Sequence, residues 1–109
     1  MAEDEPTVTG HGLSEEEVRE AIGRVRVGDL LAQTLVSSTS IAFAKLEPAT
    51  RDLEQVRIAI EALRAVLPVL HGAADEALLR DLESARANLQ LAYAKALDEE
   101  RAGDADDDG

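Results

Sequence analysis

The sequence predicts an all-α fold: a small bundle of three main helices, at about residues 29–46, 52–70 and 75–100, preceded by a short N-terminal helix. Apolar residues between positions 52 and 70 recur at alternating intervals of three and four, which is the spacing of one narrow helical face. A second face with the same spacing runs from position 78 to position 96. Helix-capping residues stand before the expected helices, at Ser14, Asp29, Asp52 and Asp75.

The short first helix begins at Ser14, with Glu17 at the capping-box position. Gly23 and Gly28 favour a kink or short break before Asp29 restarts the helix of residues 29–46. The alternative, one continuous helix through residues 14–46, stays open from the sequence.

The helix of residues 29–46 ends before Pro48, because a residue that precedes proline disfavours helical geometry. Its middle is a run of small hydroxyl residues, which permits close approach of another backbone. The candidate inward residues of this helix are Leu30, Leu31, Leu35, Ile41, Ala42 and Leu46.

The helix of residues 52–70 carries the first apolar face and packs, as an antiparallel hairpin, against the helix that follows. We expect regular helix to end or kink at Pro68, whose ring would clash with the carbonyl of Arg64. Gly72 is the expected C-terminal cap. The predicted core of the bundle is Leu53, Val56, Ile60, Leu63, Leu67, Leu82, Leu89 and Tyr93.

The predicted core is thin, with one Phe, one Tyr and no Trp in 109 residues. A second copy of the chain would supply the missing contact surface, and two-fold dimers are the commonest oligomers. We therefore expect a homodimer, and the hydroxyl-rich face supplies its contact residues: Ser37, Ser38, Ser40 and Ile41.

The net charge of −12 is concentrated at the two ends of the chain. Nine acidic residues between positions 21 and 97 are matched by nine Lys and Arg, whereas both ends are strongly acidic. Residues 1–12 and 102–109 are accordingly predicted to be disordered acidic tails around a helical domain of residues 13–101. No cluster of cations indicates direct nucleic-acid binding. Acidic tails could instead engage a basic partner, such as a nucleic-acid-binding protein or the ribosome.

No pattern in the sequence points to catalysis, a cofactor or a metal site. There is no phosphate loop, no Glu-x-x-His motif and no cysteine. His71 loosely resembles the histidine of phosphotransfer domains, but it stands in an expected turn between Pro68 and Gly72 with no lysine nearby. The absence of a signal peptide or a long apolar run predicts a cytoplasmic chain without a membrane segment. The expected partner is another, unidentified protein.

Two segments resemble the bacterial domain of unknown function 1844 family. The first is "DLEQVRIAIEAL", in which Asp52, Leu53, Ile60 and Leu63 match; the second is "LLRDLESARANLQLAYAKAL", in which the matching residues are Leu89, Gln90 and Tyr93. Val56 and Glu61 depart from that family's usual Ala and Asp, and the connecting loop of many members is missing. The resemblance covers about residues 27–97 and implies a small helical bundle with no established activity.

Overall fold

The computed structural model describes residues 14–108, with side chains described as far as Gly103. It confirms the all-α prediction: the elements in this part of the chain are four α-helices and one short 3-10 helix, without a strand. The predicted N-terminal tail, residues 1–12, lies outside the described residues.

Helix α1 spans Glu15–Arg24 and begins with the predicted capping box. The Ser14 hydroxyl accepts a hydrogen bond from the Glu17 amide at 3.1 Å, and the Glu17 carboxylate accepts one from the Ser14 amide at 2.9 Å. The chain then becomes extended at Val25 and Arg26 before α2 begins. Residues 14–46 therefore form two helices, with the predicted short break between Gly23 and Gly28. The prediction that Asp29 caps the second helix is wrong, because α2 already begins at Val27 and its N-cap, Arg26, makes no side-chain hydrogen bond.

Helix α2 spans Val27–Ala44, and its buried face agrees only in part with the predicted one: Leu35 and Ala42 are buried, and Leu46, just past the helix, is partly buried. Its buried residues are Ala32, Leu35, Thr39 and Ala42. Leu30, Leu31 and Ile41, which were expected to face inward, remain 59%, 39% and 58% exposed. Small residues on the buried side allow α2 to approach its neighbours closely, and this close packing sets the rotation of the helix.

The 3-10 helix η2 spans Pro48–Thr50 and leads into α3, which spans Leu53–Leu70. The Asp52 carboxylate caps α3 by accepting a hydrogen bond from the Gln55 amide at 3.3 Å. Pro68 lies inside α3, so of the two expected outcomes an end of the helix at this residue is wrong, while a kink stays a prediction. Only two more helical residues follow Pro68, so the backbone hydrogen bond that proline cannot donate is missing near the end of the helix, where its absence disturbs little regular structure.

Helix α4 spans Glu76–Asp108 and follows a tight turn. Gly72 adopts a positive φ of 82°, which glycine tolerates without steric cost, and the Asp75 carboxylate caps α4 through the Leu78 amide at 3.0 Å. The helix continues past the expected end near residue 100, so the predicted C-terminal tail is helical through Asp108. Adding residues to an existing helix fixes one residue for each hydrogen bond gained, which favours this extension, whereas Gly103 and the aspartates at the negative end of the helix dipole oppose it.

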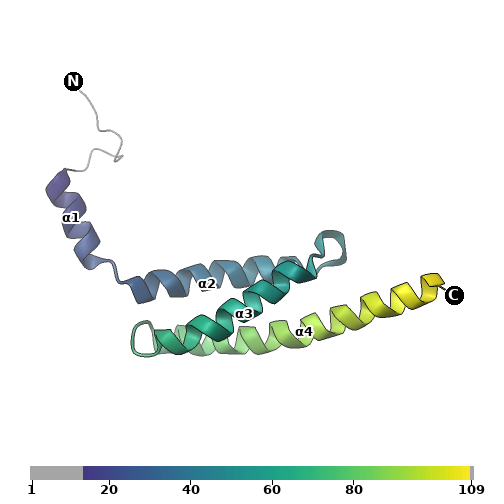
Figure 1. The fold of residues 1–109 in the computed structure, drawn as a ribbon. Coiled ribbons are helices and arrows are strands. Elements are labelled where there is room, and N and C mark those ends of the chain that lie inside the picture. The colour runs from purple at the N-terminus through teal and green to yellow at the C-terminus, as the bar shows by residue number, and fades with distance from the viewer. Residues whose placement is uncertain (1–13, 109) are drawn as a thin grey trace, which may run out of the picture.

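Helix α3 packs most extensively against α4, and α2 lies against both (Figure 1). Leu53 and Tyr93 are partly buried at the edge of the core. The other six predicted core residues are 0–5% exposed. The buried apolar residues of α2, α3 and α4 are Ala32, Leu35, Ala42, Val56, Ala59, Ile60, Leu63, Leu67, Leu70, Leu79, Leu82, Leu89 and Ala96.

The molecule is long and thin, with extents of 71 × 36 × 16 Å and a radius of gyration of 20.2 Å. A compact chain of this length would have a radius of gyration of about 13 Å. Two features account for the difference: α1 stands off one end of the bundle, and α4 extends beyond α2 and α3 at the other (Figure 1).

Candidate interaction surface

The middle of α2 carries no charged side chain. From Leu30 to Ala44 the sequence has no Asp, Glu, Lys or Arg, and Asp29 and Lys45 bound this run. A helix without a charged face is usually surrounded by other elements. Here only one side of α2 is buried, so its remaining sides present an uncharged surface to solvent.

Besides its buried face, helix α3 has two exposed edges, one charged and one apolar. The charged edge holds Glu54, Arg57, Glu61 and Arg64. Ion pairs along it join Arg57 to Glu54 at 2.7 Å and Arg64 to Glu61 at 3.7 Å. The other exposed edge, by helical periodicity, is Ile58, Ala62, Ala65 and Val69, which carries no charge. This uncharged edge borders α2.

An apolar groove of about 230 Å³ lies between these two uncharged helix edges. Ile41 of α2 and Ile58 of α3 both line it and are 58% and 47% exposed. We call it the α2/α3 groove, and its lining is Ser38, Ile41, Ala42, Gln55, Ile58, Ala59 and Ala62. The lining includes no ionisable side chain, so the groove suits contact with an apolar surface rather than acid–base chemistry.

The structure brings two of the four predicted dimer-contact residues into the groove. Ser38 and Ile41 line it, whereas Ser37 and Ser40 are exposed on other sides of α2. The α3 half of the groove was missed from the sequence. A signal was present: the charges at positions 54, 57, 61 and 64 mark one edge of the helix and leave the opposite edge apolar.

A second apolar area surrounds the junction of α1 and α2. Ile22, Val25, Val27 and Leu30 are 56–69% exposed there. A shallow depression of about 280 Å³ lies beside them, lined partly by Arg24 and other polar side chains. This area does not share lining residues with the α2/α3 groove.

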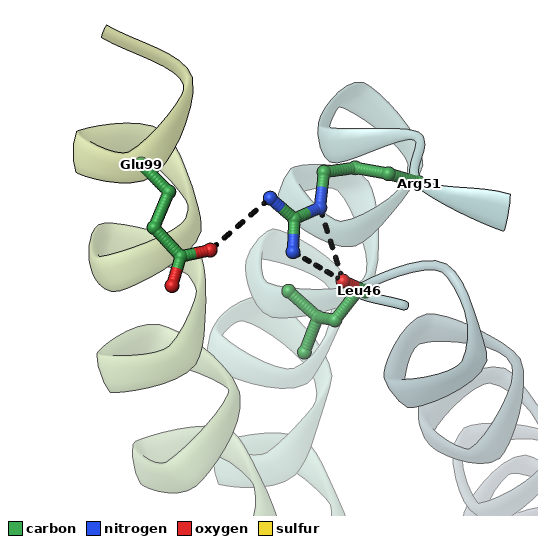
Figure 2. Close-up of polar contacts among 3 residues, drawn as sticks. All are labelled: Leu46, Arg51 and Glu99. Atoms are coloured by element: carbon green, nitrogen blue, oxygen red, sulfur yellow. Dashed lines mark hydrogen bonds and ion pairs between the residues drawn. The ribbon is translucent and has the colours of Figure 1, made fainter. Parts of the chain in front are cut away.

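A polar cluster joins the α2–α3 connection to α4 (Figure 2). Arg51 donates to the Leu46 carbonyl from Nε at 3.0 Å and from Nη2 at 2.7 Å. Its Nη1 donates to Glu99 Oε1 at 3.3 Å. The Arg51 side chain is 18% exposed, and its donors satisfy a carbonyl that has passed the end of α2. Arg51 therefore has a structural role, since it links the chain after α2 to Glu99 of α4.

His71 ends α3 and lies beside Glu76 at the start of α4. The His71 Nδ1 atom is 3.4 Å from Glu76 Oε1, and Glu76 Oε2 accepts a hydrogen bond from the Gly72 amide at 3.0 Å. The Gly72 amide, and then His71, lower the pKa of the Glu76 carboxyl below its usual value. His71 is thus placed in a turn, next to a carboxylate, and no histidine, cysteine or carboxylate cluster suited to a metal occurs among the described residues.

The described helices include none long and apolar enough to cross a bilayer. In comparisons with known proteins, no family model, no curated protein and no solved structure matches this chain.

Proposed function

We propose that this protein is a non-enzymatic, homodimeric interaction module in which a second copy covers the α2/α3 groove. The observation that carries the proposal is the uncharged surface of α2, exposed beside the uncharged edge of α3. A continuous uncharged face on a thin bundle favours burial against another protein surface. The hairpin of α3 and α4 serves, in this proposal, as the scaffold that holds the face in place.

The face is large enough for a dimer contact. Helices α2 and α3 have 18 residues each, so each is about 27 Å long. Two such helices side by side present a face about 20 Å wide, or roughly 540 Å² in projection. A standard interface buries about 800 Å² of accessible surface on each partner, and a ridged helical face has more accessible surface than its projection.

Sedimentation equilibrium of the wild-type protein at high micromolar concentration tests the dimer directly. A matched pair of variants then tests the face. Ser38→Leu fills the groove and should weaken self-association roughly tenfold, whereas Ser40→Leu makes the same change outside the groove and should not. A monomeric wild type, or equal effects of the two variants, would contradict the proposal.

The acidic end of α4 favours a second candidate function, that of a regulator which binds a basic partner. Asp98, Glu99 and Glu100 are exposed on α4, and Glu99 is paired there with Arg51; Figure 1 shows α4 continuing beyond the other helices toward the C-terminus. Binding through these carboxylates should weaken steeply as salt is added, while binding through the α2/α3 groove should not. A salt series on any recovered complex therefore separates the two functions.

A further inference from the structure

Helix α1 has no substantial packing partner among residues 14–108. None of its residues is buried, and Ile22 and Val25 are 66% and 56% exposed. Figure 1 shows α1 off the end of the bundle, away from α3 and α4. A helix of ten residues is too short to be stable alone in water, where about 12–15 residues are marginal even for good helix formers. We therefore expect α1 to be stabilised by packing against another surface.

The apolar stripe of α1 suits the α2/α3 groove, because both are uncharged and the stripe is short enough to fit. Val18, Ala21 and Ile22 follow the i, i+3, i+4 pattern of one face of α1, and exposed Val25 comes directly after the end of the helix. From Val18 to Ile22 the stripe rises about 6 Å, which fits within the rise of about 10 Å along α3 between Gln55 and Ala62 of the groove lining. Because the groove lining has no charge, the Glu and Arg side chains on the other sides of α1 would remain in water.

If α1 folded back along α2 of its own chain, its stripe would not lie opposite this groove. If α1 folded back along α2 from the extended residues Val25 and Arg26, Val18 would lie about 11 Å along the helix. Ser38, where the groove begins, is eleven residues beyond Val27, or about 17 Å. The stripe would thus end about one helical turn short of the groove.

We infer that α1 of a second copy occupies the α2/α3 groove, with each copy supplying one helix and one groove. This inference rests on the proposed homodimer and names the segment that covers its contact face. Reciprocal exchange is a closed two-fold arrangement, which uses both unpartnered surfaces and leaves no open end for further association. The extended residues Val25 and Arg26 act as the connection between the bundle and the exchanged helix.

Disulfide trapping tests the exchange, because the natural chain contains no cysteine. Ile22→Cys and Ile58→Cys are made in separate full-length proteins, mixed, equilibrated and oxidised, and the mixed disulfide is measured by intact mass. Both positions are exposed in the single chain, so neither change disturbs the bundle. The matched control is Glu20→Cys with Ile58→Cys, since Glu20 lies on the side of α1 opposite the stripe.

We expect the Ile22 and Ile58 pair to give at least roughly tenfold more mixed disulfide than the control pair, as contact through one helix face requires. A dimer that gives no such preference would overturn the exchange while leaving the proposed homodimer intact. A monomer would overturn both. As a second measurement, Ile22→Asp should raise the dimer dissociation constant roughly tenfold or more, without changing the thermal unfolding of a dilute, monomeric sample.

Discussion

Gly28 and Gly23 look equivalent in the sequence, and replacing each with alanine should separate their roles. A Cβ atom added at Gly28 would overlap the carbonyl oxygen of Ala73 and lie 2.8 Å and 2.9 Å from the Ala73 carbonyl carbon and Cβ. A Cβ atom added at Gly23 meets nothing within 4 Å. Gly28 is therefore the position where the start of α2 packs against the α3–α4 turn.

The size of the effect follows from two opposing contributions. Alanine favours a helix interior over glycine by about 1 kcal/mol, but Gly28 is the second residue of α2, where this advantage is smaller. Against this, carbon atoms pack at about 3.5–4.0 Å, so α2 must move away from the turn by about 1 Å. Overpacking of this kind costs about 1–3 kcal/mol, and the cost rises if fully buried Ala32, one turn further along α2, is drawn away from its neighbours. The net expectation for Gly28→Ala is a destabilisation of about 1–2 kcal/mol.

Urea unfolding followed by circular dichroism, at one fixed protein concentration, measures this destabilisation. For a small domain a change of about 1–2 kcal/mol lowers the urea midpoint by roughly 0.5–1 M. Gly23→Ala serves as the control and should leave the midpoint of the bundle unchanged or slightly higher. If Gly28→Ala were as stable as Gly23→Ala, the close approach of α2 to Ala73 would not hold in solution and the reasoning would fail.

Three further predictions use the same unfolding measurement. Leu63→Ala removes a side chain that is 1% exposed and should cost about 2–5 kcal/mol, whereas Leu91→Ala, at a position 72% exposed, should cost under about 0.5 kcal/mol. Thr39→Val should stabilise the fold by about 1 kcal/mol, since the buried Thr39 hydroxyl has no hydrogen-bond partner among the described residues; a destabilised variant would reveal a missing partner. The lowered pKa of Glu76 means that its ionised form, bonded to the Gly72 amide, stabilises the native turn above the unfolded pKa of about 4.3. This contribution is lost as the pH falls below that value, so wild type and Glu76→Gln should differ at pH 7 and converge near pH 3; a constant difference would contradict the assignment.

Local sequence patterns were sufficient to predict the contacts that depend on a single residue. Ser14, Asp52 and Asp75 cap their helices as predicted, because a side-chain oxygen one turn before an amide needs no tertiary partner. The positive φ of Gly72 is a local property of the same kind. Pro68 shows the limit of such reasoning, since its effect depends on how far the helix continues beyond it.

Helices α3 and α2 show what the sequence by itself determined and what only the tertiary structure decided. On α3 the charges at Glu54, Arg57, Glu61 and Arg64 occupy one edge, so the spacing of its leucines was sufficient to identify the buried face. On α2 the run from Leu30 to Ala44 has no charge on any side, and apolar spacing does not distinguish one face from another. Tertiary packing made the choice: the side with Gly28, Ala32 and Leu35 lies against α3, α4 and their turn, and the missing Cβ of Gly28 permits the close approach to that turn. That rotation leaves Ile41 exposed beside Ile58, and the α2/α3 groove exists because two helices far apart in the sequence meet with their uncharged edges side by side.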